Sequence, residues 1–403
     1  MTESFLSRAP IIHVGSTKNL RQRKKTTAAR PGVLWFEFTD DYSVFDHGKM
    51  PDTIPNKGAA AAMLSAHLFE RIAKPATWKS FWKNGVLDRV RDRKLRHELA
   101  DSPVLATLRR NGFPTHYQGI VNDKGEAVSL SKLRKPSRVL QVAAVRIIPP
   151  RSFLLGGRRL YDYNAFQPGL SNYLVPLECV FRFGAPRGSS LFGRLASIPG
   201  YARELGLSSS KIAEGADLPR PVIEYFSKLE PSDRFLTPEF ALNASGLSGE
   251  DFITLTHATL LTALWLREQF RETELKLWDG KFEFVRIGKT VVLGDAITPD
   301  ELRLTTKRLQ ISKEPLRQYH THYQPGFVDA MNKAKKLAEF DPRSLAEIVK
   351  SLGHAPKPLD AEFLGAVSDM YAGITERLLG REIFGGTASL STVTRRLARF
   401  GAA

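Results

Sequence analysis

Apolar and polar positions along the chain predict a mixture of strands and helices. Short apolar runs bounded by turn residues predict strands, at residues 11–14, 33–38, 139–148 and 174–183. Apolar residues with helical spacing predict helices, at residues 59–72, 80–110, 248–271 and 360–378. The helix from Ser248 opens with a capping box, because Asp251 stands three residues later. Strands and helices do not alternate regularly, so the pattern predicts an α+β fold.

The segment Trp278-Asp279-Gly280-Lys281-Phe282-Glu283-Phe284 is the most informative part of the pattern. Alternate side chains of a strand share a face, so Asp279, Lys281 and Glu283 are expected to point the same way. The apolar run 290–293 predicts the second strand of a hairpin, which brings Asp295 close to Glu283. Two carboxylates with phosphate oxygens and water form a typical Mg²⁺ site. An ordinary hairpin with its charges in solvent is the more frequent outcome of such a pattern.

Three other groups of residues have alternative interpretations. Residues 181–190 place two arginines, two glycines and two serines after a strand, which suits a phosphate but equally a plain loop. Thr298-Pro299-Asp300-Glu301 is either a helix N-terminus or a substrate-facing turn. His320 and His322 lack a third metal ligand nearby, and Cys179 lies in an apolar run, so both are interpreted as structural.

The composition indicates a folded protein that attracts anions. Of 403 residues, 42% are hydrophobic, and 59 Lys and Arg against 42 Asp and Glu give a net charge of +17. That charge favours nucleic acid, nucleotides, sugar phosphates or dicarboxylates without choosing among them. The single cysteine excludes an internal disulfide, and no apolar run approaches the ~20 residues of a membrane span. The first ten residues do not resemble a signal peptide, so a soluble, cytoplasmic protein is expected.

Several short motifs resemble the SAICAR synthetase family in the order in which that family shows them. They are Gly15-Ser16-Thr17-Lys18, Ser43-Val44-Phe45-Asp46, Ile54-Pro55-Asn56-Lys57-Gly58, Gly112-Phe113-Pro114-Thr115-His116, Val175-Pro176-Leu177-Glu178, Arg182 with Gly188-Ser189, Ser227-Lys228-Leu229-Glu230 with Asp233, Asp279-x-Lys281-x-Glu283, and Gly294-Asp295 with Pro299-Asp300-x-x-Arg303. Each motif is weak alone, whereas their number and order are specific. The resemblance covers roughly residues 11–335 and omits 80–105, 151–171 and the tail after about 340.

The resemblance implies a two-lobed fold, similar to kinases and ATP-grasp enzymes, with ATP between the lobes. Residues 1–175 would form an N-terminal β-rich nucleotide-binding lobe with a charged helical insertion near 80–105. Residues 176–340 would form a C-terminal α+β catalytic lobe, and 341–403 a helical extension. The implied reaction is the joining of L-aspartate to the carboxylate of carboxyaminoimidazole ribotide, with ATP and Mg²⁺, through an acyl phosphate in purine biosynthesis.

The resemblance also implies roles for individual residues. Lys18 and Lys228 would bind the ATP phosphates and Glu178 would lie near the adenosine, while Glu283 and Asp295 would hold Mg²⁺. Asp279, Lys281 and Asp300 would be catalytic. The remaining substrate-binding residues would be Asp46, Arg182, Ser189, Asp233 and Arg303.

Departures from the family pattern leave other functions open. The family usually has lysine where Ser16 stands and an acid where Ala296 stands, so these two departures affect the expected handling of the ATP phosphates and the metal. A paralogue that runs the same acyl-phosphate chemistry on another carboxylate or amine is an alternative. The net charge leaves a non-catalytic protein that binds anions or nucleic acid as a further alternative. For the enzyme, the expected partners are small molecules, with neither nucleic acid nor a membrane; a homo-oligomer is compatible with the sequence.

Overall fold

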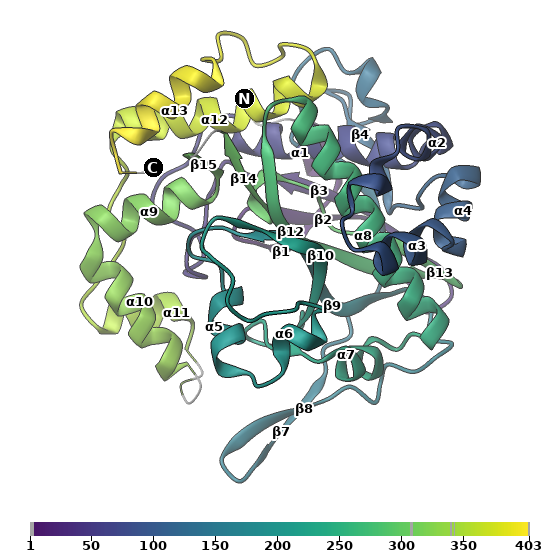
Figure 1. Ribbon diagram of the computed structural model, residues 1–403. Coiled ribbons are helices and arrows are strands. Elements are labelled where there is room, and N and C mark those ends of the chain that lie inside the picture. The colour runs from purple at the N-terminus through teal and green to yellow at the C-terminus, as the bar shows by residue number, and fades with distance from the viewer. Residues whose placement is uncertain (1–3, 307–308, 339–340, 342, 402–403) are drawn as a thin grey trace.

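The computed structural model describes residues 4–306, 309–338, 341 and 343–401, in which helices surround two large antiparallel sheets (Figure 1). The first sheet has the strand order β1-β2-β3-β6-β4-β5. Its strands are β1 (Ile11–Val14), β2 (Lys18–Lys24), β3 (Gly32–Phe38), β4 (Tyr117–Val121), β5 (Ala127–Val128) and β6 (Val139–Ala144), with the 3₁₀ helices η1 (Ser4–Arg8) and η3 (Leu130–Lys132) beside them. The sequence pattern did not predict β2, which is almost entirely polar.

Helix α1 (Lys57–Ile72) covers the first sheet and buries Ala62, Met63 and Ala66 against it. Its first turn approaches the end of β3 so closely that a Cβ at Gly58 would lie 2.7 Å from the carbonyl oxygen of Phe38. Glycine is therefore required where α1 begins, directly after Lys57.

Residues 75–111 are helical, as the spacing predicted. They form α2 (Pro75–Lys83), the 3₁₀ helix η2 (Val86–Arg89), α3 (Arg93–Ala100) and α4 (Pro103–Asn111). Helix α4 packs on α8, so this charged segment lies beside the second sheet's main helix.

The second sheet has the order β11-β10-β9-β12-β14-β15, with β13 also paired to β12. Its strands are β9 (Tyr173–Ala185), β10 (Ala216–Ser227), β11 (Phe235–Leu236), β12 (Lys276–Ile287), β13 (Thr290–Leu293), β14 (Leu302–Thr306) and β15 (Leu309–Ser312). The connections contain α5 (Leu191–Ser197), α6 (Tyr201–Glu204), α7 (Pro238–Ser245) and the 3₁₀ helix η4 (Pro299–Glu301). The predicted hairpin is confirmed, since β12 and β13 pair from Phe284–Leu293 to Ile287–Thr290.

Helix α8 (Gly249–Glu272) packs on β9, β10 and β12 and buries most of its length. It begins at the predicted cap: the Ser248 hydroxyl accepts a hydrogen bond from the amide of Asp251 at 3.2 Å. The capping side chain satisfies one of the amides that a helix N-terminus leaves without a partner.

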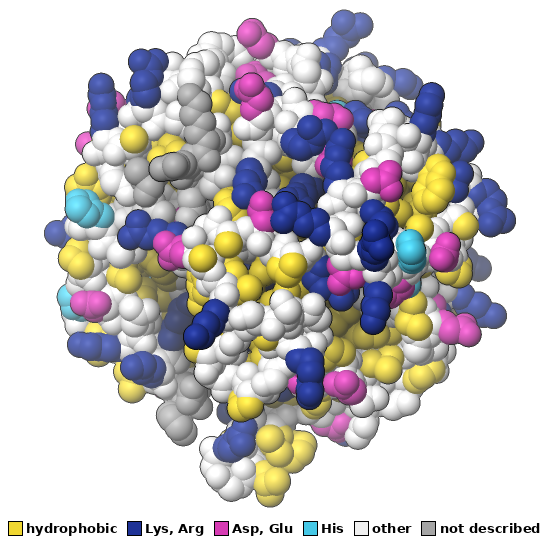
Figure 2. Space-filling model, viewed as in Figure 1, with side chains coloured by type: hydrophobic (Ala, Val, Ile, Leu, Met, Phe, Trp, Pro, Cys, Tyr) yellow, Lys and Arg dark blue, Asp and Glu magenta, His cyan; other side chains and the backbone are white. Residues whose placement is uncertain are grey.

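Main-chain hydrogen bonds join the two sheets at two places. The amide of His116, before β4, donates to the carbonyl of Leu293 at 2.9 Å, and the amide of Arg146, after β6, donates to that of Asn172 at 2.9 Å. Beyond Arg146 in the chain, β7 (Arg151–Leu155) and β8 (Arg158–Asp162) project as a separate two-stranded ribbon (Figure 1). The end of this ribbon exposes apolar side chains, at the bottom of Figure 2.

The C-terminal part is helical and shares the core of the second sheet. It contains α9 (Glu314–Tyr323), α10 (Pro325–Leu337), α11 (Leu345–Ser351), α12 (Ala361–Leu379) and α13 (Leu390–Ala398). Helix α12 packs on α1, α13 and β15, and buries Phe363, Val367, Met370 and Ile374 as its spacing predicted. Helix α13 was not predicted.

The α+β prediction is confirmed by this mixture of helices with antiparallel sheets. The boundaries proposed at 175 and 340 stay a prediction.

Ser248→Ala is expected to lower the free energy of unfolding by about 1 kcal/mol, because it removes the cap of α8. Urea denaturation followed by circular dichroism measures the change. Ser197→Ala, at an exposed serine of α5, is the control and should change stability by less than about 0.5 kcal/mol. Equal effects of the two substitutions would contradict the importance of the cap.

Candidate active site

A cavity of about 940 Å³ lies between the two sheets. One end is mainly apolar, although Gln22, Lys24 and Arg146 also line it; its apolar side chains are Leu20, Leu34, Phe36, Ala143, Ala144, Val145, Ile147, Ile148, Leu174 and Val285. The other end carries charged side chains, from Lys18, His116, Lys228, Glu283 and Asp295. The cavity therefore offers an apolar slot that leads to a cluster of lysines and carboxylates.

The turn at Asp295 forms one corner of the cavity and is stabilised by a contact to its main chain. Asp295 has a φ of 50°, which is unusual for a residue other than glycine, and its carbonyl accepts a hydrogen bond from His116 Nε2 at 2.7 Å. A carbonyl can only accept, so Nε2 of His116 carries the proton; burial and the Lys18 ammonium both lower the pKa of His116. A neutral His116 thus supports the turn, and the Asp295 carboxylate forms an ion pair with Lys18.

Two carboxylates face each other across neighbouring strands beside this corner. The pairing of β9 with β12 places Glu178 opposite Glu283. Lys228 lies between them, with Nζ 2.8 Å from Glu178 and 2.7 Å from Glu283. Lys281 lies 2.7 Å from Glu178 and 3.3 Å from Glu301. The lysines offset the repulsion of like charges at opposite strand positions, and the carboxylates raise the pKa of both lysines although burial lowers it.

Glu283 and Asp295 fit a divalent cation in combination with phosphate oxygens. Both line the cavity, and Glu283 Oε1 is buried without an aligned hydrogen bond despite its ion pair with Lys228. Within the described residues, no three His, Cys, Asp or Glu side chains gather as a metal site. Hard oxygen ligands suit Mg²⁺, which usually takes only one or two carboxylates from the protein.

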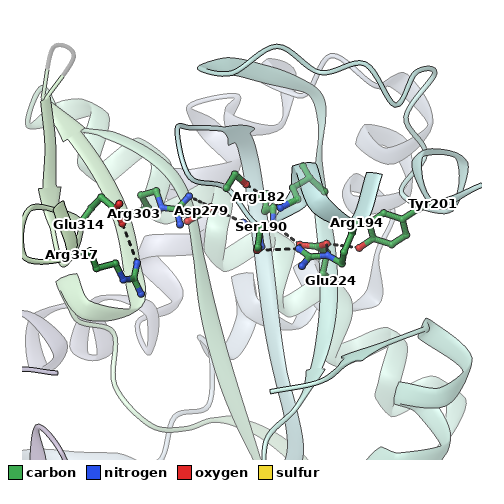
Figure 3. Close-up of polar contacts among 11 residues, drawn as sticks. Arg182, Ser190, Arg194, Tyr201, Glu224, Asp279, Arg303, Glu314 and Arg317 are labelled. Atoms are coloured by element: carbon green, nitrogen blue, oxygen red, sulfur yellow. Dashed lines mark hydrogen bonds and ion pairs between the residues drawn. The ribbon is translucent and has the colours of Figure 1, made fainter. Parts of the chain in front are cut away.

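Arg182 forms the centre of a second network (Figure 3). Its guanidinium forms an ion pair with Glu224 through Nε and donates to Asp279 at 2.7 Å and to Ser190 at 3.3 Å. Glu224 also accepts hydrogen bonds from Arg194 and Tyr201. Arg182 is 5% exposed, so these acids compensate for the burial of its charge.

Arg303 lies on the other side of Asp279 (Figure 3). Its NH1 is 3.5 Å from the Asp279 carboxylate and makes no hydrogen bond to any residue that the structure describes. Arg303 is therefore the arginine of this network with the greater capacity for a further partner.

Ser189 is buried, and its hydroxyl accepts a hydrogen bond from the amide of Leu191 at 3.4 Å.

Asp300 belongs to a third group. Its carboxylate accepts from Lys57 Nζ at 2.7 Å and from the Tyr371 hydroxyl. Burial raises the pKa of Asp300, but Lys57, Lys313 and the Tyr371 hydroxyl lower it to about 2 overall. Tyr371 lies on α12, so this helix of the predicted C-terminal extension reaches a predicted site residue.

Two predicted substrate residues lie apart from these networks. The side chain of Asp46 is 79% exposed and pairs with Lys335 of α10 at 2.7 Å. Asp233 lies in the turn after β10 and keeps contact with solvent; partial desolvation by the surrounding protein and the charges of Glu178 and Asp46 raise its pKa to about 6. The structure does not bring either side chain into direct contact with the other predicted residues.

The remaining candidates are structural. His320 is buried and lies 3.1 Å from the Tyr42 hydroxyl, whereas His322 is exposed, so they do not face a common site. Burial raises the pKa of the Cys179 thiol, which agrees with its interpretation as a buried small side chain.

Sequence analysis assigned no role to several residues that the site contains. Lys57 and His116 lie within motifs that were identified, so those motifs were the available signal. Glu301 likewise lies in the segment 298–301, which was identified. Glu224 and Tyr371 have no such signal, because their partners are distant in sequence.

Comparison with known proteins identifies the class to which this fold and cavity belong. The model of the SAICAR synthetase family matches residues 21–117 and 170–334, and the chain belongs to that family. The matched ranges include residues 80–105, and they leave out residues 118–169 and the C-terminal helices from α11 onward.

Individual relatives agree with this family. A putative phosphoribosylaminoimidazole-succinocarboxamide synthase of Archaeoglobus fulgidus is 29% identical over 92% of this chain and 95% of its own length. The synthase of Thermoplasma acidophilum is 28% identical over 56% of this chain and 74% of its own. The Saccharomyces cerevisiae SAICAR synthase structure has a TM-score of 0.53 and 18% identity, and covers 93% of this chain and 96% of its own.

No helix among the described residues is long and apolar enough to cross a membrane.

Glu224→Gln is expected to lower the free energy of unfolding by about 3 kcal/mol at pH 7, because it removes one partner of buried Arg182. The arginines and Tyr201 lower the pKa of Glu224 although burial raises it. The ionised form therefore stabilises the fold above the unfolded-state pKa, and this contribution is lost as pH falls through the lower folded-state value.

Denaturation of wild type and variant between pH 3 and 8 measures the difference, which should shrink toward the acid end. Glu362→Gln, in an exposed pair with Arg399, is the control and should change stability by less than about 0.5 kcal/mol at any pH. A difference independent of pH would contradict the assigned ionisation.

Proposed function

We propose that this protein is an ATP- and Mg²⁺-dependent ligase that joins L-aspartate to the carboxylate of carboxyaminoimidazole ribotide in purine biosynthesis. The observation that carries the proposal is the cavity between the sheets, whose apolar slot ends at paired lysines and carboxylates, in a chain of the SAICAR synthetase family. The named relatives support the same reaction. Small-molecule substrates and a cytoplasmic location follow from the proposal.

The side chains that line the cavity support one orientation of the nucleotide. Leu34, Val285 and the other apolar wall residues suit a purine ring, while Lys18 and Lys228 at the charged end suit its phosphates. Glu178 forms ion pairs with Lys228 and Lys281, which supports a role in positioning those lysines; its contact with the adenosine stays a prediction. Ser16 lines the same cavity, and its hydroxyl offers a weaker phosphate contact than a lysine.

Glu283 and Asp295 would hold Mg²⁺, which when bound neutralises phosphate charge and fixes the phosphates for transfer. Both carboxylates form ion pairs at the charged end of the cavity, Glu283 with Lys228 and Asp295 with Lys18. The protein thus supplies two oxygen ligands and two lysines at the same place.

The second substrate would occupy the space beside Asp279 and Arg303. Arg303 has donor capacity for the ribotide phosphate, and Arg182, which also donates to Ser190, holds Asp279 in place. Lys281 is aligned by Glu178 and Glu301 and would offset the charge that develops when a carboxylate approaches a phosphate.

The proposed reaction has two steps. A ribotide carboxylate oxygen attacks the γ-phosphorus of ATP, and the bond to the ADP oxygen breaks, which gives an acyl phosphate and ADP. The neutral amine nitrogen of L-aspartate attacks the acyl carbon, inorganic phosphate leaves, and the nitrogen loses a proton as the amide forms. The enzyme contributes chiefly positioning and charge compensation.

The proposal is tested by ADP formation from ATP and Mg²⁺ with the ribotide held constant and the amine varied. ADP is expected only when the ribotide is present, with L-aspartate the preferred amine. A clear preference for another amine would replace the proposal with a paralogous ligase. The absence of ADP with every pairing would reject a ligase altogether.

Glu283→Gln is expected to lower turnover at least about hundredfold in saturating Mg²⁺, because the amide cannot replace a charged metal ligand. The fold should persist, since Lys228 retains Glu178 and a like-charge contact is removed. Initial rates and thermal unfolding of the same preparation measure both effects. Glu250→Gln, at an exposed position in the first turn of α8, is the control and should retain wild-type turnover; full activity of Glu283→Gln would exclude the assignment.

A further inference from the structure

Tyr371 connects the C-terminal helices to the predicted substrate pocket. The residue lies on α12, beyond the segments that match the family, and is completely buried. Its hydroxyl donates a hydrogen bond to Oδ1 of Asp300, while Lys57 Nζ donates to Oδ2 at 2.7 Å. Lys57 Nζ also lies 5.2 Å from the centre of the Tyr371 ring, so the three side chains form one compact group.

This group fixes the Asp300 carboxylate from two helices. Each carboxylate oxygen has a donor, one from α1 and one from α12, and the two donors together define the orientation of the carboxylate plane. The amide of Asp300 donates to the Thr298 hydroxyl at 3.3 Å, which also restrains the main chain. Because Lys57 and Tyr371 are buried, neither donor has water as an easy alternative partner.

The 3₁₀ helix η4, which carries Asp300, also contacts the cluster of lysines and carboxylates through Glu301. Asp300 and Glu301 are adjacent in η4, and Glu301 lies 3.3 Å from Lys281 while Asp300 contacts Lys57 and Tyr371. An anchor at Asp300 therefore restrains the turn that presents Glu301 to Lys281.

We propose that Tyr371 is a positioning residue for the ligase reaction, holding Asp300 and the η4 turn in the geometry that the second substrate requires. The inference rests on the proposed function, because Asp300 is one of the residues that the family resemblance makes catalytic in that reaction. Helix α12 is then a working part of the active site.

Tyr371→Phe tests the proposal, because it retains the ring and its contact with Lys57 and removes only the hydroxyl. We expect kcat/KM for the ribotide or for L-aspartate to fall about tenfold, the effect of one hydrogen bond to a charged group. The KM for ATP should stay within about twofold, since the ATP residues lie elsewhere. Tyr173→Phe is the matched control: Tyr173 is equally buried and donates to the carbonyl of Ser245 at 3.0 Å, so its activity should equal that of wild type.

A second variant distinguishes positioning from general packing. If Tyr371 acts through Asp300, the Tyr371→Phe change should have little further effect on activity or unfolding in an Asp300→Asn background. Additive losses, or wild-type kinetics of Tyr371→Phe, would overturn the inference while leaving the proposed function intact. If wild type forms no ADP with any pairing, the proposed function fails instead, and the positioning role fails with it.

Discussion

The pairing of Glu178 with Glu283 across β9 and β12 is the contact on which the candidate active site depends. Two carboxylates at opposite strand positions repel each other, and burial strengthens the repulsion because few water molecules screen it. Lys228 contacts both carboxylates and Lys281 contacts one. The pairing of the two strands in this register therefore depends on the two lysines, which offset the repulsion between the carboxylates. A shift of one residue in the strand register would turn the β12 charges to the opposite face, toward the apolar core.

Local patterns predicted those features that depend on neighbouring residues. The alternation at Asp279, Lys281 and Glu283, the hairpin that follows and the cap of α8 were all visible, because a strand period of two and a helix cap are short-range properties. Strand β2 was missed because its sequence, KNLRQRK, has one apolar residue, and its place in the sheet comes from pairing with β1 and β3 rather than from its own pattern.

Long-range partners were beyond the reach of local patterns. Arg182 looked like a phosphate ligand after a strand, yet three of its donor groups are committed to Glu224, Asp279 and Ser190. A sequence does not reveal whether a buried guanidinium meets a ligand or an acid 42 residues away. The motifs of the family located the site, whereas the contact between Tyr371 and Asp300 required the packing of α12 against α1.

The ion pairs of Lys18 with Asp295 and of Lys228 with Glu283 have a consequence for nucleotide exchange. On the proposed assignments, a magnesium nucleotide enters by swapping partners: its phosphates take the lysines and its cation takes the carboxylates. The free energy of binding is then the difference between two sets of charge contacts rather than the full value of one. Such a site discriminates by charge arrangement while keeping affinity moderate, which allows spent nucleotide to leave quickly and the next one to enter.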